Sequence, residues 1–361
     1  MKKFLAILLL ACMMLAMAAC GQQAAPAEQP AEAPAEAPAE APAEAPAEAP
    51  AEEPAEEPAP TPAEYRLGMG VVMKFSDGKA QIDATTAAVV LDAEGKIVAA
   101  KIDVAQDKMD VTDGQVDTEA VFQTKKELKE AYGMSNIGKA EWYIQAAAFE
   151  EFVIGKTVEE IEAVELVQDG EHMVFADETL KASCSISVGE FKDAVVKACK
   201  DEQGMSFTAD GAFKLGLAII SSADGSTAAT AEEDGTVKMY SDYAAVVVGE
   251  DGKILAALTD ATQPNITINA DGEVVETAFK GTKRELKEEY GMSSIGKTEW
   301  YIQAAAFEQF AVGKTAAELK SVELVQDGSH MVFADEALKA SCSISVDDII
   351  AVTVLAAEYA A

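Results

Sequence analysis

Residues 124–150 of this chain are written a second time at residues 282–308. The first stretch reads TKKELKEAYGMSNIGKAEWYIQAAAFE and the second reads TKRELKEEYGMSSIGKTEWYIQAAAFE. Residues 164–188 and 322–346 match in the same way, at the same offset of 158. The chain therefore contains one domain twice, and any site of that domain should occur twice. A residue kept in both copies is a better candidate for function than a residue found in one.

The N-terminus has the features of a targeting segment. Two lysines precede an apolar stretch, residues 4–17, which is too short to span a membrane. It ends in MAACG, which resembles the cleavage signal of lipoproteins, in which the cysteine becomes the new N-terminus and carries lipid. We therefore expect a signal peptide over residues 1–19, lipidation of Cys20, and an extracytoplasmic protein anchored to the cell membrane. The alternative is ordinary secretory cleavage near Ala19.

Residues 20–64 form a low-complexity segment. Eleven prolines and eleven glutamates lie between Pro26 and Glu64, without any lysine or arginine. Regular proline excludes a continuous helix, and repulsion between like charges extends the chain. At about 3.1 Å per residue, a segment of this length reaches on the order of 120 Å. We expect a disordered spacer, the alternative being a disordered tail with no required length.

The acidic composition limits the classes of partner. The formal net charge is −35, whereas nucleic-acid binding needs a basic surface. We therefore expect no nucleic acid, and contact with a membrane only through the lipid anchor. The oligomeric state is not indicated by the sequence.

Three cysteines follow Cys20, namely Cys184, Cys199 and Cys342. Cys184 and Cys342 are repeat equivalents, so they could pair only if the two domains faced each other there. No CxxC or His–Cys spacing indicates a metal site. We expect these cysteines to act as small buried residues, although the sequence does not fix their redox state.

The rest of the chain divides into two domains of ordinary size, residues 65–202 and 213–361, joined by a linker over residues 203–212. Each copy opens with β-rich segments. Two such runs flank Glu94–Gly95 and Asp251–Gly252, which is typical of a hairpin.

The pattern then changes from strands to helices. Residues 125–132 and 141–152 have helical periodicity, and Thr157 opens a third helix with a capping-box pattern. Residues 185–199, SISVGEFKDAVVKAC, predict a closing amphipathic helix capped by serine. Strands followed by helices predict an α+β fold, in which each domain is a small antiparallel sheet followed by helices.

An aromatic block is repeated in both copies. On a helix, Trp142, Ala146 and Phe149 share one face. That face could stack on a planar ligand or anchor the helix in the core. The aromatic candidates for cofactor contact are Trp142, Tyr143, Trp300 and Tyr301.

Few other residues suggest chemistry. His172 and His330 are equivalent, and each follows Asp-Gly-x, which indicates a turn or surface position. The sequence has no GxSxG, HExxH, Walker loop or GxGxxG pattern. No motif of a hydrolase, transferase or metal enzyme is therefore present, and any redox role would belong to a cofactor.

Two segments of each copy carry a family resemblance. The hairpin around VVLDAEGKI (89–97), and Ser183 to Ser187 leading into a helix, resemble the FMN-binding domain of extracytoplasmic flavoproteins. The resemblance implies an attachment site at which FMN is joined to a threonine hydroxyl through a phosphoester. In register, Ser185 and Ser343 fall at that threonine. The chain departs from the motif, because serine replaces threonine and Cys184 and Cys342 stand where the family has Gly-Ala.

A second possible acceptor lies in an insertion of copy two. DGSTAAT, residues 224–230, resembles a flavin-transferase target and would make Thr230 the acceptor. Its small residues are equally typical of a flexible loop.

Two main functions follow as hypotheses. The first is a cell-surface lipoprotein with two FMN-binding-like domains, which passes electrons to a redox partner protein. The second is a tandem binding or structural module without a cofactor and without catalysis. Solute capture for a transporter fits less well, because each copy is complete and nothing indicates that the chain crosses between lobes.

Overall fold

A computed structural model describes residues 62–136, 140–295 and 298–360. The predicted signal peptide, Cys20 and nearly all of the predicted tether lie outside these residues. The described residues belong to one compact unit.

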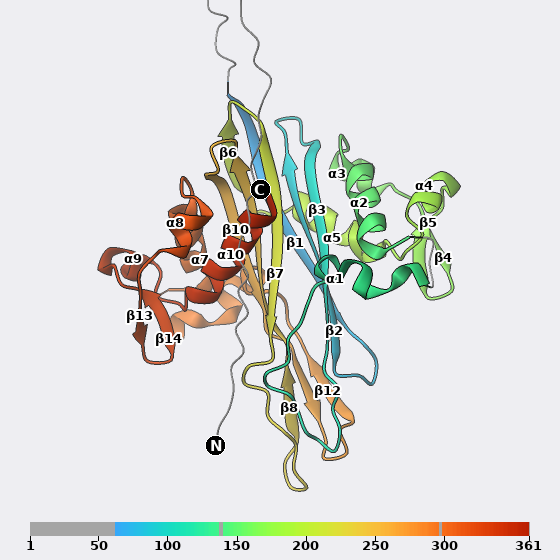
Figure 1. Cartoon of the computed structure of the whole chain (residues 1–361), viewed down its shortest axis with the longest axis vertical. Helices are drawn as coiled ribbons and strands as arrows, with labels where there is room; N and C mark the ends of the chain where they lie inside the picture. The colour runs from blue at the N-terminus through green and yellow to red at the C-terminus, as the bar shows by residue number, and fades with distance from the viewer. Residues whose placement is uncertain (1–61, 137–139, 296–297, 361) are drawn as a thin grey trace, which may run out of the picture. The chain divides into compact units, whose positions relative to one another are not determined.

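Copy one begins with three long antiparallel strands (Figure 1). The hairpin predicted at Glu94–Gly95 is confirmed, because Gly95 adopts a φ of 77° and the Asp92 carboxylate accepts the N–H groups of Glu94 and Lys96. A fourth strand follows the last helix of the copy and pairs with β1, which gives the sheet order β3-β2-β1-β6. The strands are β1 (Ala63–Phe75), β2 (Gln81–Leu91), β3 (Ile97–Lys108) and β6 (Met205–Ala209).

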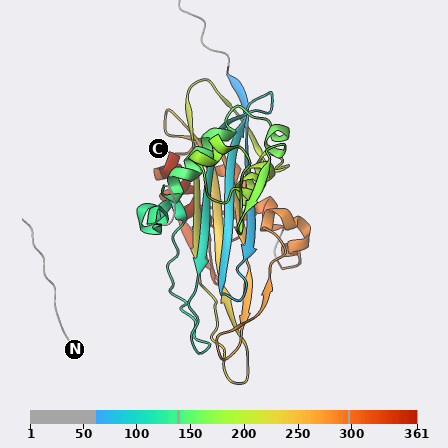
Figure 2. The same cartoon turned by 90° about the vertical axis from the view of Figure 1, so that its right-hand side faces the viewer.

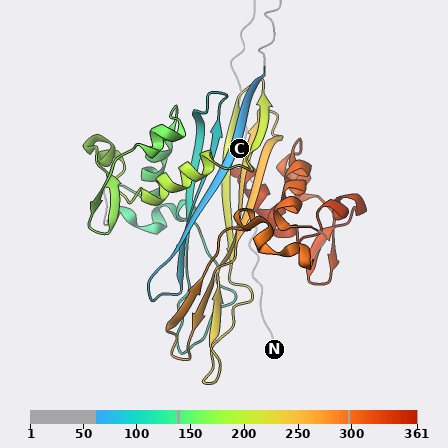
Figure 3. The ribbon, with the colours of Figure 1, turned by 180° about the vertical axis from the view of Figure 1, so that it is seen from behind.

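Copy two builds an equivalent sheet of order β10-β9-β7 and adds a second, smaller sheet of order β12-β11-β8. The smaller sheet extends beyond one end of the main strands (Figure 3). Residues 109–122 of copy one pack on it, and Val111, Val116 and Phe122 join its apolar core. The strands are β7 (Phe213–Ser222), β8 (Gly235–Lys238), β9 (Tyr240–Gly249), β10 (Ile254–Thr262), β11 (Asn265–Ile268) and β12 (Val274–Ala278).

The helical part of each copy has the same order of elements. Thr124, Thr157, Thr282 and Thr315 all form complete capping boxes, so the prediction at Thr157 is confirmed. In copy one the elements are α1 (Lys125–Leu128), η1 (Lys129–Tyr132), η2 (Met134–Asn136), α2 (Trp142–Val153), α3 (Val158–Glu162), β4 (Leu166–Asp169), β5 (His172–Phe175), α4 (Glu178–Ser183) and α5 (Gly189–Cys199). In copy two they are α6 (Lys283–Leu286), η3 (Lys287–Tyr290), η4 (Met292–Ser294), α7 (Trp300–Ala311), α8 (Ala316–Lys320), β13 (Leu324–Asp327), β14 (His330–Phe333), α9 (Glu336–Ser341) and α10 (Asp347–Ala360).

The two copies pack together through the inner faces of their sheets. Alternate residues of β1 and β7 meet there in one apolar core, which includes Leu67, Met69, Leu215 and Leu217. The helices of each copy cover the outer face of its own sheet, as Figure 2 shows for copy one. Each sheet is therefore buried on both faces, and the arrangement has four layers.

Two equivalent glycines set the spacing between sheet and helix. Gly68 on β1 faces α5, and Gly216 on β7 faces α10. A Cβ atom at these positions would lie 2.0 Å from the carbonyl oxygen of Ala198 and 1.9 Å from that of Ala356. Only a residue without a side chain allows the helix backbone to approach the strand this closely.

The α+β class is confirmed, and three local features differ from expectation. The predicted serine cap of α5 is wrong, because the N-cap is Val188 and the Ser187 hydroxyl accepts the N–H of Met173 instead. The segment expected to be only a linker, 203–212, contains strand β6, because its alternating residues pair with β1. The short hairpins β4–β5 and β13–β14 were not predicted, since each strand has only four residues.

Candidate functional site

The predicted acceptors Ser185 and Ser343 occupy the same half-buried environment in the two copies. The backbone N–H and the hydroxyl of Ser185 both donate to Oε1 of Gln145, at 2.8 and 3.0 Å. Ser343 makes the same two bonds to Gln303, at 2.7 and 3.0 Å. Because each glutamine lies on the long helix α2 or α7, the loop before the closing helix is held rigidly against that helix.

The residues around the two serines differ in charge. α5 begins with glycine and its N-cap Val188 provides no side-chain acceptor. α10 instead begins with Asp347 and Asp348, two carboxylates beside the positive end of the helix dipole. The loop after Ser185 therefore suits an added anion better than the loop after Ser343.

The cysteines beside the acceptors are buried in the apolar cores. Cys184 and Cys342 are each 1% exposed, and Cys199 is 8% exposed. All three are free thiols, and burial raises the pKa of each to about 12. They act as small core residues rather than as nucleophiles.

The aromatic candidates divide into two groups. Trp142 and Trp300 are each 3% exposed and pack in the outer cores of their copies, where Trp142 meets Phe191 edge to face at 5.6 Å. Tyr143 and Tyr301 reach the surface, and their hydroxyls donate to Glu130 and Glu288. Only the tyrosines present a ring edge to solvent, so the repeated block serves mainly as a core helix.

Thr230 lies exposed in an insertion that the structure holds in place. Ala229 donates its N–H to the carbonyl of Gly114 in copy one at 2.8 Å. The Thr230 hydroxyl accepts the N–H groups of Glu232 and Glu233. The small-residue composition therefore corresponds to a hydrogen-bonded turn docked on the other copy.

The two histidines begin the second strand of equivalent short hairpins and are exposed. The ring of His330 hydrogen-bonds through Nδ1 to the Ser345 hydroxyl at 2.8 Å. Within the described ranges, no group of three or more histidine, cysteine or acidic side chains is placed to hold a metal ion. Among the same residues, no helix is both long and apolar enough to cross a membrane.

A buried carboxylate lies in the layer between the two sheets. Asp107 at the end of β3 is 1% exposed, and desolvation raises its pKa to about 6. The hydroxyls of Ser221 and Ser241 face it and lower its pKa, while Asp83 raises it. In the described part of the chain no hydrogen bond of ordinary geometry reaches either carboxylate oxygen. The surroundings of Asp107 therefore favour its neutral form more than water does.

Replacing Asp107 should change how stability depends on pH. A carboxyl whose pKa is about 6 when folded and 3.8 when unfolded stabilises the fold most below pH 3.8. That contribution is lost as pH rises through about 6, because the native state must then ionise a buried group; the loss is about 2–3 kcal/mol. Between pH 4 and 7, the free energy of unfolding of the wild type should therefore fall by about 2–3 kcal/mol more than that of Asp107→Asn. Urea unfolding of both proteins at several pH values measures this difference. The same pH dependence of stability in the two proteins would contradict the raised pKa of Asp107.

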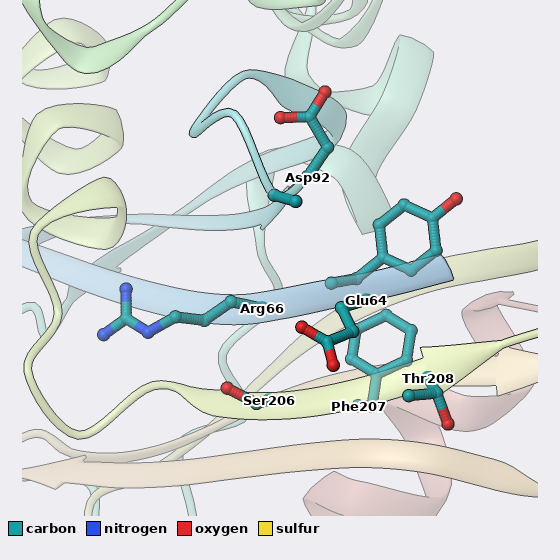
Figure 4. Close-up of a pocket in the computed structure, with 8 residues that line it drawn as sticks. Glu64, Arg66, Asp92, Ser206, Phe207 and Thr208 are labelled. Atoms are coloured by element: carbon teal, nitrogen blue, oxygen red, sulfur yellow. The ribbon is translucent and has the colours of Figure 1, made fainter. Parts of the chain in front are cut away.

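One surface hollow lies where β6 joins β1. It has a volume of about 520 Å³ and is lined by Glu64, Arg66, Asp92 and Phe207 among others. Figure 4 shows Glu64 beside Phe207, with Arg66 extending away from Asp92. The Asp92 carboxylate is already bound by turn N–H groups, and the Arg66 guanidinium donates to the carbonyl of Cys199. The polar groups of this hollow mainly hold the fold.

Two other hollows lie at equivalent places between the copies. The first, the lysine cleft, has a volume of about 630 Å³ and lies between α1, α2 and β3 of copy one and β7 and α10 of copy two. The second, the arginine cleft, has a volume of about 400 Å³ and lies between α6 and β10 of copy two and β1 and the end of α5 in copy one. Lys126 in the first corresponds to Arg284 in the second.

Comparison with known proteins gives one distant relative. Part of the chain is similar to a chlorophenol reductase from Desulfitobacterium hafniense. The two are 32% identical over 117 residues, which is 26% of this chain and 36% of the relative. The chain thus spans about a third of the length of this curated relative. No family model and no solved structure matches the chain.

The sequence interpretation did not identify the lysine cleft. Two of its three lysines, Lys101 and Lys129, come from β3 and from η1, and its apolar wall comes from the other copy. Lys101 corresponds to Leu258, so a search for residues kept in both copies passes over it. A comparison of where the copies differ in charge would have found it.

Proposed function

We propose that this protein is a lipid-anchored, extracytoplasmic redox protein whose domains carry FMN and pass electrons to a partner protein. The observation that carries the proposal is the similarity of part of the chain to a protein named as a reductase. The placement of Ser185 and Ser343 before equivalent helices supports it, because the resemblance to FMN-binding domains puts the attachment hydroxyl there. Cys20 and an acidic tether would hold the domains away from the membrane.

The residues at Ser185 fit an attached flavin phosphate. The hydroxyl is half-buried rather than enclosed, and its only described partner is the neutral side chain of Gln145. The first turn of α5 lacks a side-chain cap, so no side chain occupies its N–H groups and they remain available to an anion at the start of the helix. When bound, flavin supplies one-electron or hydride transfer, and the chain supplies attachment and orientation.

The two copies are expected to differ in loading. A phosphate on Ser343 would meet the Asp347 and Asp348 carboxylates of the first turn of α10, and like charges repel. A phosphate on Ser185 meets one acidic residue there, Glu190, whose carboxylate is bound by Lys74. We therefore propose Ser185 as the principal attachment site.

The experiment is to produce the full chain together with a flavin transferase. The expected product is yellow, is fluorescent on a denaturing gel, and exceeds the unmodified mass by one FMN less one water for each loaded site. Ser185→Ala should remove most of the label, whereas Ser343→Ala and Thr230→Ala should retain it.

Two outcomes would oppose this proposal. An intact mass equal to that of the unmodified chain, without visible absorbance after non-covalent reconstitution with FMN, would exclude flavin. Loss of the label in the Thr230 variant alone would move the attachment site to the insertion of copy two.

A second candidate function is a binding module without a redox cofactor. The observation that favours it is the lysine cleft, which neither copy forms alone and which lies apart from both serines.

A further inference from the structure

The two inter-copy clefts are built from equivalent elements, so each is an internal control for the other. In each, a residue at the first turn of a short helix binds a buried glutamate of the long helix. Lys126 binds Glu150 in the lysine cleft, and Arg284 binds Glu308 in the arginine cleft. The opposite wall comes from the other copy in both, through Leu215 and Leu217 in one and Met69 and Val71 in the other.

In the arginine cleft, the charged side chains pair with one another. Arg284 also donates to the carbonyl of Gln203 at 2.8 Å and lies 3.7 Å from the Asp201 carboxylate. Lys197 is paired with Glu285 across the cleft, and Lys287 lies 3.5 Å from Glu202. The carboxylates of Asp201 and Glu202 thus lie beside two cations of the cleft, Arg284 and Lys287.

In the described part of the chain, the lysine cleft has no equivalent segment with carboxylates. Tyr359 stands at the position of Asp201, so a neutral ring replaces a carboxylate. Lys129, the equivalent of Lys287, and Lys101, the equivalent of Leu258, both line the cleft. Among the described residues, neither lysine side chain forms an ion pair or a hydrogen bond.

Each of the three carboxylates that line the lysine cleft already has hydrogen-bond partners, and two of them are bound by other lining residues. Asp103 accepts the N–H groups of Val104 and Lys126. Glu127 accepts the N–H of Thr124 and the hydroxyl of Tyr359. Glu150 accepts the N–H of Ile102 and binds Lys126.

Beyond these groups, a further hollow continues the cleft outward. It shares Lys101, Leu215 and Tyr359 with the cleft and adds Lys214 and Glu151. The outer part therefore adds one cation and one anion. Three lysines and three carboxylates line the lysine cleft, so its formal charges balance, and among the described residues Lys101 and Lys129 are its two cations without a paired carboxylate.

We propose that the lysine cleft binds a small organic anion, a carboxylate or sulfonate joined to an apolar or aromatic body. Lys101 and Lys129 bind the anionic group, because charge-assisted hydrogen bonds in a partly closed cleft are strong. The rings of Tyr143 and Tyr359, with Ala147, Leu215 and Leu217, contact the apolar body. The volume of about 630 Å³ lies within the range of small-molecule sites.

A matched pair of fluorescent probes tests the proposal. 8-Anilinonaphthalene-1-sulfonate is an aromatic anion, and N-phenyl-1-naphthylamine is its neutral counterpart without the sulfonate. The protein is the full chain prepared without a flavin transferase, so the result does not depend on flavin loading. We expect saturable binding of one sulfonate probe per chain and at least about tenfold weaker binding of the neutral probe.

The variants assign the site to the lysine cleft. Lys101→Leu copies the residue found in the other copy, and combined with Lys129→Gln it should weaken sulfonate binding at least about tenfold. Lys287→Gln, the equivalent change in the arginine cleft, should leave binding unchanged, and near-identical melting curves show that each variant is folded. Equal affinity in the wild type and the double variant, or an equal loss in Lys287→Gln, would overturn the proposal.

Discussion

Arg284→Ala is expected to lower the free energy of unfolding by about 3–5 kcal/mol, because it leaves a buried carboxylate without its cation. Glu308 is 3% exposed, and its Oε1 accepts the N–H and hydroxyl of Thr259 in addition to Arg284. Burial raises the pKa of Glu308 even with the guanidinium beside it. Without Arg284, the carboxylate must therefore stay uncompensated or take up a proton.

The matched control is Lys126→Ala in copy one. Lys126 and Glu150 form the equivalent pair, but the lysine side chain is 28% exposed and water can replace it. Its loss should cost only about 1 kcal/mol. Chemical unfolding of the two variants at pH 7 measures both values, and equal losses would show that the arginine network has no special role.

Gly216→Ala should lower the free energy of unfolding by about 3 kcal/mol or more. The loss arises from a clash with helix backbone rather than from conformational strain. The Cβ of Gly216→Ala would lie 1.9 Å from the carbonyl oxygen of Ala356 in α10. Carbonyl groups within a helix cannot rotate away, so the whole helix must move off the sheet. Gly68→Ala should behave alike against α5, because its Cβ would lie 2.0 Å from the Ala198 oxygen.

Gly189→Ala serves as the comparison, since a Cβ there would meet only side-chain atoms of Met173, at 3.3 Å or more. Gly189→Ala should change the free energy of unfolding little, and copy two has Asp347 at the equivalent position. Thermal unfolding of the three variants ranks them by loss of stability. A melting temperature for Gly216→Ala close to that of Gly189→Ala would mean that α10 does not approach β7 as described.

Much of the fold follows from local sequence patterns. The turn at Glu94–Gly95, the capping box at Thr157 and the buried stripe of Trp142, Ala146 and Phe149 all appear where short-range rules place them. The packing of one copy on the other does not follow in this way. Strands β1 and β7 read as nearly continuous apolar runs, which shows that both faces are buried but does not say what covers the second face.

The site was harder to predict for a different physical reason. Requiring residues to recur in both copies favours those that hold the shared fold, such as Trp142, Cys184 and Gln145. It selects against residues through which the copies differ, and Lys101 is one of them. The serines remain candidates on resemblance, whereas the lysine cleft emerges only from contacts between segments far apart in the sequence, such as those of Glu127 and Tyr359, which are 232 residues apart.

The apolar core that joins the two sheets has a consequence for specialisation. Two separate identical subunits packed in this way would carry two identical clefts, and every substitution would alter both. Covalent linkage of the copies removes that constraint, because each copy can then change without the other. One cleft can therefore acquire ion pairs that join the copies while the other stays open. Asp201, a carboxylate, and Tyr359, a neutral phenol, occupy the same position of the repeated unit and show how the two clefts have diverged.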